Sequence, residues 1–170
     1  ARELAFALRH ADVALLLTPA RFLNPDYLER LERAAPELAE QRGAPLRVRA
    51  LPYLREVRVW ETPSGETPGG ESAGSNRAWT SGGAAALEAL GASLDDALLA
   101  EAEREVSPAD PLVVIYSSGS TGDPKGAIHA HGSVLRHARN LNQYCDLVPE
   151  DHMYSPMPFF WVGGFVFSLL

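Results

Sequence analysis

Cysteine is almost absent from this sequence of 170 residues. Cys145 is the only one, so the chain cannot form an internal disulfide, and it has no cysteine pair with the spacing of a zinc site. The disulfide-rich secreted scaffolds are thereby excluded. We expect a reducing, cytoplasmic location, and we expect Cys145 to be a small buried side chain near the end of a helix.

Long apolar runs and an excess of positive charge are also missing. No apolar run reaches the roughly 18 residues that span a bilayer, so no transmembrane segment is predicted. Lys and Arg number 15 against 22 Asp and Glu, which gives a formal net charge of −7. An acidic chain has no general attraction for nucleic acid or anionic lipid. Any anionic ligand must therefore be bound locally, by backbone amides and a placed lysine.

The two ends of the sequence lack the marks of a complete protein. The chain begins at Ala1 without methionine or a signal-peptide layout, and it stops at Leu170 inside an apolar stretch. We therefore expect an internal piece of a longer polypeptide. Its length and its 46% of hydrophobic residues are enough for a domain with a real core.

Apolar runs and helically spaced leucines alternate along the chain. The expected strands are short and apolar, at 13–17, 54–60, 111–116, 127–130 and 151–157. The expected helices carry apolar residues at helical spacing, at 1–11, 24–43, 87–106 and 133–144. Asn24-Pro25 is the expected start of the second helix, and Pro36 is a candidate break in it. This alternation predicts an α/β fold with a mostly parallel sheet flanked by helices.

Composition divides the chain into three segments. Residues 1–60 form an α/β segment, and residues 85–170 form a second one. Residues 61–84 between them are rich in Gly, Ser, Thr, Pro and Glu, which predicts a flexible surface loop without a core. Trp79 is expected to pin one end of this loop.

The stretch from Ser117 to Gly126 directly follows the clearest strand. Its glycines let backbone amides approach a ligand without a Cβ in the way, and its hydroxyls add donors. Lys125 supplies a point positive charge and Pro124 stiffens the backbone before it. Amides, hydroxyls and one lysine suit a polyphosphate.

Three other interpretations of this stretch fit less well. A Ser/Gly linker without a function would not account for the position of the stretch between two apolar segments or for its Pro-Lys-Gly end. A Walker loop requires Gly-Lys followed by Ser or Thr, whereas Lys125 follows Pro124 and precedes Gly126. A hydrolase elbow, Gly-x-Ser-x-Gly, fails because Ser118 stands two residues before Ser120.

The glycine-rich stretch and the end of the strand before it resemble the signature of the AMP-binding, adenylate-forming superfamily. The residues that carry this resemblance are Ile115-Tyr116-Ser117-Ser118-Gly119-Ser120-Thr121-Gly122-Asp123-Pro124-Lys125-Gly126. Ala130-His131-Gly132-Ser133 resembles the segment that follows it there, and residues 156–164 resemble the next motif. Within that superfamily the chain is most similar to acyl-CoA synthetases, and it would be part of their large N-terminal domain, with the C-terminal domain absent.

The resemblance implies an ATP-dependent acid–thiol ligase. A carboxylic acid would attack the α-phosphate of ATP to give acyl-AMP, and CoA would then take the acyl group. Thr121 and Lys125 would act in catalysis, and Mg²⁺ would be carried mainly by the phosphates. The ATP phosphates would be held by the loop residues Ser117, Ser118, Gly119, Ser120, Thr121, Gly122 and Lys125. The fragment by itself would be inactive, because the later family motifs are absent.

An aromatic and glycine-rich motif is the candidate acid-binding segment. Phe160 and Trp161 would line an acyl pocket, with Gly163 and Gly164 leaving room for a chain. Trp161 stands where many members of the superfamily have histidine. The competing interpretation, that these aromatics are ordinary core, stays open. An apolar wall favours fatty or related acids over amino acids.

Two alternatives to an acyl-CoA ligase remain open. The first is a peptide-synthetase adenylation domain, which a downstream carrier module would indicate. The second is a non-catalytic nucleotide-binding module. No metal site is expected among the histidines, because His129 and His131 have no evident third ligand. The sequence does not identify the acid, the final acceptor or the oligomeric state.

Overall fold

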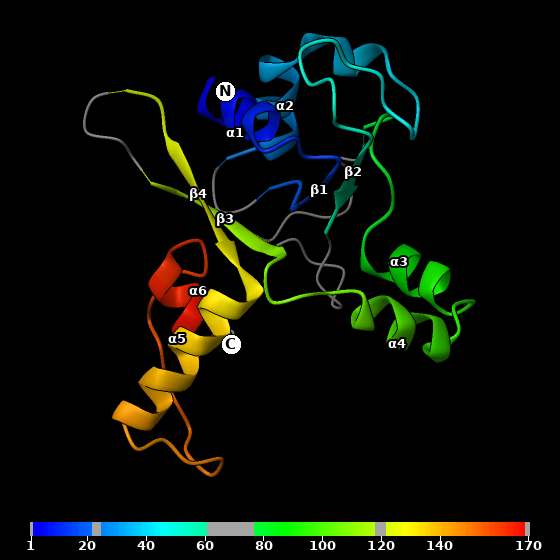
Figure 1. The fold of residues 1–170 in the computed structure, drawn as a ribbon. Coiled ribbons are helices and arrows are strands. Elements are labelled where there is room, and N and C mark those ends of the chain that lie inside the picture. Colours follow the sequence, from blue (N-terminus) through cyan, green and yellow to red (C-terminus); the bar gives the residue numbers. More distant parts are fainter. Residues whose placement is uncertain (1, 22–24, 61–76, 118–121, 169–170) are drawn as a thin grey trace. The chain divides into compact units, whose positions relative to one another are not determined.

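Helices and short strands alternate from Arg2 to Ser168 in the computed structural model, which describes residues 2–21, 25–60, 77–117 and 122–168 (Figure 1). The chain forms two compact units, an N-terminal unit at Ala1–Leu94 and a C-terminal unit at Asp95–Leu170. Each unit combines helices with a two-stranded sheet. The predicted α/β class is thus confirmed, whereas the three-segment division stays a prediction.

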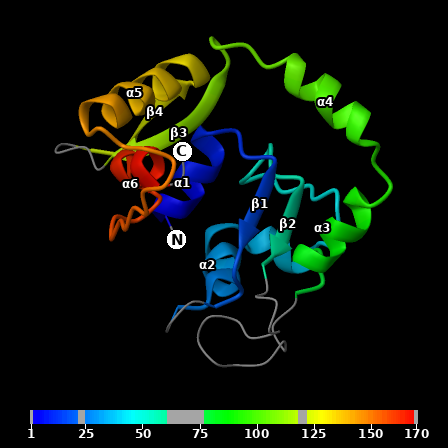
Figure 2. The ribbon, with the colours of Figure 1, turned by 90° about the horizontal axis from the view of Figure 1, so that it is seen from below.

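The sheet of the N-terminal unit is a parallel pair. Strands β1 (Leu15–Thr18) and β2 (Glu56–Val59) lie side by side, with Leu16 opposite Val57 (Figure 2). A crossover containing α2 (Tyr27–Ala34) and the 3-10 helix η1 (Pro36–Glu40) joins them, as parallel pairing requires. Only one face of β1 is covered, since Leu15 and Leu17 are about half exposed. The apolar run at 13–17 therefore forms the expected strand without being fully buried.

The crossover helix begins later than the sequence suggested. Helix α2 spans Tyr27–Ala34, and its cap is Asp26, whose side chain accepts a hydrogen bond of 2.8 Å from the amide of Glu29. This bond satisfies an otherwise unpaired amide of the first turn. Pro36 ends the α-helix as anticipated, because it cannot supply the next amide. The chain continues as η1 (Pro36–Glu40).

Side chains from the whole N-terminal unit meet in one core. Helix α1 (Arg2–His10) contributes Leu8, and the crossover contributes Leu28, Leu31 and Leu38. Trp79 is 2% exposed, and its Nε1 donates to Glu32 Oε1 over 3.1 Å. The same oxygen accepts from Arg77 Nε at 3.0 Å. Glu32 therefore anchors the segment that follows residues 61–76, which confirms the expected role of Trp79.

The predicted helix at 87–106 is two helices. Helix α3 (Ala84–Gly91) ends at the Gly91-Ala92 step, and α4 (Asp96–Arg104) begins after Asp95, whose side chain accepts from the amide of Ala97 at 2.9 Å. An aspartate cap of this kind starts a new helix. The break places Leu90 on α3 and Leu98 on α4, with Leu94 between the two helices, and all three are exposed.

The C-terminal unit is built on an antiparallel hairpin. Strands β3 (Pro111–Ser117) and β4 (Lys125–Ala130) pair from Pro111 opposite Ala130 to Ser117 opposite Lys125. The connection at 118–124 is shorter than the dozen or so residues that a parallel crossover needs. Among the described residues, parallel pairing joins β1 to β2 and continues in one isolated bridge between Arg58 and Ser81.

Two helices follow the hairpin, α5 (His131–Tyr144) and α6 (Val162–Ser168). The expected strand at 151–157 does not form; prolines 156 and 158 lack the amide that a strand ladder uses. Cys145 is exposed just beyond α5, so its predicted burial was wrong. No helix within the described ranges is long and apolar enough to cross a membrane.

Candidate functional site: a hairpin that frames a phosphate-binding loop

The strand register brings two predicted phosphate ligands together. Ser117 ends β3, Lys125 begins β4, and the two are cross-strand partners at the mouth of the connecting loop. Directly opposed residues of an antiparallel pair have Cβ atoms about 4.5–5.5 Å apart. Ser118, Gly119, Ser120 and Thr121 lie outside the described residues. The site is therefore defined here by its base, Ser117 and Lys125, and by Gly122.

Lys125 is chemically distinctive. It is the only lysine of the chain, since the other basic side chains are all arginine. Its side chain is exposed, and it forms no ion pair with the acidic residues that the structure describes. A compact ammonium on a flexible stem can follow a phosphate as a point charge. The Lys125 charge is thus available to an anion at the hairpin mouth.

The glycine next to this lysine leaves little room for a side chain. A Cβ on Gly126 would lie 3.2 Å from Cε1 of the Tyr116 ring and 3.0 Å from Cγ1 of Val114. Tyr116 and Gly126 are cross-strand partners, so the ring lies across the glycine backbone. This packing fixes the strand positions beside Ser117 and Lys125.

The opposite end of the hairpin is tied by backbone contacts. The amide of Gly132 donates to the Pro108 carbonyl over 2.8 Å, and that of His131 donates to the Asp110 carbonyl over 3.0 Å. A Cβ on Gly132 would come within 2.9 Å of the Pro108 carbonyl oxygen. The first turn of α5 is thereby held against the turn that leads into β3. The loop end of the hairpin therefore projects from a fixed base.

The aromatic motif lies largely open. Phe160 and Trp161 pack edge to face with their ring centroids 5.7 Å apart, and their exposed fractions are 71% and 57%. They are thus not ordinary core residues within this unit. Gly164 has a packing role of its own, because a Cβ there would lie 2.1 Å from the Pro158 carbonyl oxygen. A Cβ on Gly163 would lie 3.1 Å from Sδ of the Met157 side chain. Their part in an acyl pocket stays a prediction.

Histidine and carboxylate side chains do not gather into a metal centre. In the ranges that the structure describes, no three His, Cys, Asp or Glu side chains are placed to hold one ion. His129 lies on β4, while His131 and His137 lie on α5.

Sequence reasoning missed two supporting residues, Tyr116 and Pro108. The alternation of β3 and β4 around the loop could have indicated that Tyr116 faces Gly126, since both lie one position from the loop ends. The contact between Pro108 and Gly132 had no sequence signal, because it depends on how the turn at 107–110 folds back.

Comparison with known proteins identifies the family. The family model of the AMP-binding enzymes matches residues 1–170. The chain belongs to the AMP-binding enzyme family. YngI of Bacillus subtilis (strain 168), provisionally named an acyl-CoA synthetase, is 26% identical to this AMP-binding enzyme over 170 residues, which are 100% of this chain and 29% of YngI.

Shorter matches are to proteins named as CoA synthetases or CoA ligases. Acetyl-coenzyme A synthetase 2 of Saccharomyces cerevisiae is 39% identical over 61 residues, which are 35% of this chain and 9% of that protein. Indoleacetate–CoA ligase of Aromatoleum aromaticum is 38% identical over 60 residues, 35% of this chain and 12% of the ligase. This AMP-binding enzyme chain thus spans less than a third of the curated relatives it matches. No solved structure matches it.

Proposed function

We propose that the full-length protein is an AMP-forming acyl-CoA ligase. In the first step the carboxylate oxygen of the acid attacks the α-phosphorus of ATP, and the bond to the β-phosphate breaks to release pyrophosphate. In the second step the thiolate of CoA attacks the acyl carbon of the acyl-adenylate and AMP leaves. The carboxylate needs this activation because it is a poor electrophile without a good leaving group.

One observation carries the proposal: the Ser117–Lys125 register at the mouth of the family signature. This register puts the residue with the hydroxyl, Ser117, and the residue with the ammonium, Lys125, on the two sides of the proposed phosphate-binding loop. Gly122 adds an open backbone, since no atom of the described residues lies within 4 Å of where its Cβ would stand. We assign the β- and γ-phosphates of ATP to residues 117–122 and Lys125. Lys125 and Thr121 would stabilise the charge that develops on the leaving pyrophosphate.

The hairpin also suits a phosphate-bound cation. Mg²⁺ would neutralise part of the ATP charge, held chiefly by the phosphates, because the described residues offer no ready-made metal cage. With the cation bound to the phosphates, Lys125 is left free to follow the leaving pyrophosphate. We propose a cytoplasmic location, where ATP and CoA are at hand.

We further propose that the acid is fatty or otherwise apolar. The relatives are named for acetate and indoleacetate, so their names do not single out one substrate. The preference rests on the exposed rings of Phe160 and Trp161, which offer apolar surface that a hydrocarbon chain would cover. An amino-acid substrate would need an acidic partner for its amine.

The test is carboxylate-dependent exchange of labelled pyrophosphate into ATP by the full-length protein, across fatty, aromatic and amino acids. Exchange with a fatty or aryl acid, followed by acyl-CoA formation when CoA is added, is the expected result. Exchange with an amino acid alone would replace the proposal with a peptide-synthetase-type domain. Binding of ATP without any exchange would indicate a non-catalytic nucleotide module. Residues 1–170 alone should give no exchange.

A further inference from the structure

A polar pocket lies within the N-terminal unit, and none of its lining residues belongs to the hairpin. It has a volume of about 400 Å³, within the range of about 300–1,000 Å³ that small-molecule sites occupy. Three of its lining residues are Arg47, Arg49 and Arg55, and none is acidic. The chain has a net charge of −7, so a pocket whose charged lining residues are all positive needs an explanation.

Local folding brings the three arginines together. Residues 46–49 alternate, with Leu46 and Val48 buried in the core and Arg47 and Arg49 exposed. Alternation in an extended segment puts side chains i and i+2 on one face. The amide of Leu46 donates to the Arg55 carbonyl over 2.7 Å, which places Arg55 beside this segment. Buried Leu46 and Val48 thus fix the backbone from which Arg47 and Arg49 project, and the hydrogen bond from Leu46 holds Arg55 beside them.

Hydrogen bonds fix the backbone of the pocket, while the guanidinium groups of Arg47 and Arg49 are left without a partner among the described residues. Glu37 and Gln41 accept hydrogen bonds from the amides of Arg49 (2.5 Å) and Arg47 (3.1 Å), respectively. The guanidiniums of these two arginines have no hydrogen-bond or ion-pair partner among the described residues.

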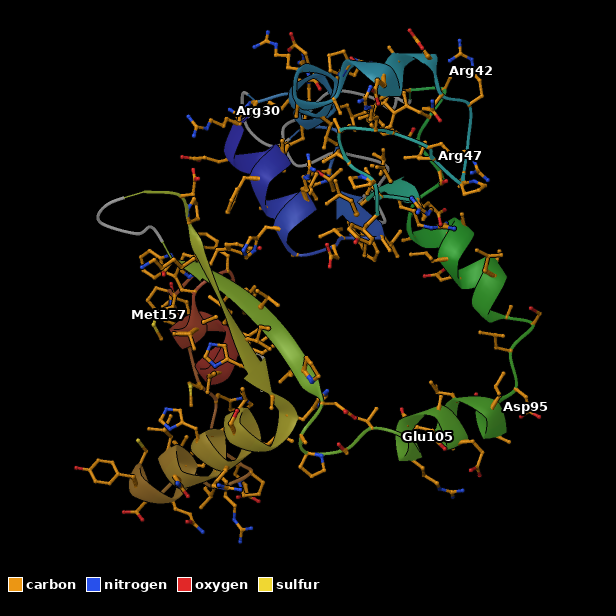
Figure 3. The ribbon with its side chains drawn as sticks, turned by 45° about the horizontal axis from the view of Figure 1, so that its top comes forward. Arg30, Arg42, Arg47, Asp95, Glu105 and Met157 are labelled. Carbon is orange, nitrogen blue, oxygen red and sulfur yellow. The ribbon has the colours of Figure 1, made fainter. Side chains whose placement is uncertain are left out.

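Arg55 is already oriented by the protein. Its Nη1 donates to the carbonyls of Pro52 (2.7 Å) and Leu54 (3.2 Å). A guanidinium has five donors, so Nε and Nη2 remain for a ligand. Figure 3 shows Arg47 projecting outward from the N-terminal unit, well apart from Arg30.

The pocket is not where the sheet would place a substrate. Arg55 immediately precedes β2, so the pocket adjoins the amino end of that strand. Substrates of open α/β sheets bind beyond the carboxyl ends of the strands. A ligand here would therefore occupy a second site.

We propose that the pocket formed by Arg47, Arg49 and Arg55 binds a phosphorylated small molecule that carries at least two negative charges. Guanidinium forks match phosphate oxygens in pairs, and three cations within one pocket require several negative charges in a compact ligand. This site is independent of the proposed ligase activity.

The test uses the full-length protein and inorganic tripolyphosphate as the probe, titrated by calorimetry. The double variant Arg47→Gln/Arg49→Gln removes two charges from the pocket. The control Arg30→Gln/Arg33→Gln removes two charges from α2, and the hairpin is unchanged in both variants. Neither pair should impair folding, because these four side chains are exposed.

The pocket variant should lose one binding event or weaken it at least about tenfold, as expected when charge-assisted hydrogen bonds are removed. The control should keep that event. Citrate, a tricarboxylate, should bind more weakly than tripolyphosphate. Equal binding by both variants and the wild type would overturn the proposal, since every event would then lie elsewhere. Tighter binding of citrate, or of a hexaglutamate peptide, would overturn the phosphate assignment.

Discussion

The two units of this chain are held together by different means. In the N-terminal unit, buried side chains from β2 and the crossover fill one core, including Leu28, Leu38 and Val57 at 0% exposure, and Leu16 of β1 packs against it. In the C-terminal unit, Val134 and Val166 are the buried apolar residues of the described part. Its order comes from the β3–β4 ladder and from glycines that allow backbone segments to touch.

This difference separates scaffold from chemistry. A unit stabilised by burial tolerates few losses of side-chain volume, whereas a unit stabilised by backbone contacts tolerates few added atoms. The proposed phosphate loop belongs to the second kind, where amides and small residues must stay accessible to a ligand. Truncation and enlargement should therefore have opposite patterns of effect in the two units.

The largest expected difference is between two tryptophans. Trp79→Ala should lower the free energy of unfolding of the N-terminal unit by about 3–5 kcal/mol, because it opens a cavity in a close-packed core. Trp161→Ala, at a side chain that is 57% exposed, should cost far less. Urea unfolding of the full-length protein, followed by far-UV circular dichroism, measures both. Equal losses would show that the two units do not differ as described.

A pair of glycines tests the reverse effect. Gly132→Ala should destabilise the C-terminal unit by about 1–3 kcal/mol, since the new Cβ would be forced against Pro108. Gly91→Ala meets nothing within 4 Å at the end of α3 and should stabilise by up to about 1 kcal/mol through helix propensity. Thermal unfolding of the two variants gives the comparison. A neutral Gly132→Ala would remove the argument for a backbone-tied hairpin base.

The smallest expected effect concerns two glutamates of α2. Glu32→Gln keeps an acceptor for Trp79 but loses the ion pair with Arg77. In that pair the side chain of Arg77 is 33% exposed and that of Glu32 is 26% exposed. This substitution should cost up to about 1 kcal/mol. Glu29→Gln breaks a more exposed pair with Arg33 and should cost about 0.3–0.5 kcal/mol. If the Glu29 variant were the less stable one, the anchoring role of Glu32 would be lost. Urea midpoints at low salt report the difference.

Local signals in the sequence predicted much of this fold. The strand expected at 111–116 is observed at Pro111–Ser117, and the helix expected at 133–144 is observed at His131–Tyr144. Apolar runs and helical spacing act over neighbouring residues, so they can be read directly. The Asp95 cap was a local signal that we missed, and it divides the predicted helix at 87–106.

What escaped prediction depends on contacts between distant residues. The Glu32–Trp79 hydrogen bond and the Gly132–Pro108 contact join segments whose proximity no local pattern encodes. Helical spacing predicted α5, yet Leu135, one of its apolar residues, is 52% exposed. The family signature identified the loop, but only the antiparallel register showed that Ser117 and Lys125 face each other.

The most direct test of the central claim is pyrophosphate–ATP exchange by the Lys125→Ala variant of the full-length protein. Arg104→Ala, which removes an exposed positive charge from α4 in the same unit, is the control. If Lys125 stabilises the departing pyrophosphate, its loss should reduce exchange by about 10²–10³-fold while folding and the control remain as in the wild type. Wild-type exchange in the Lys125→Ala variant would contradict the assignment of the hairpin as the phosphate-binding site.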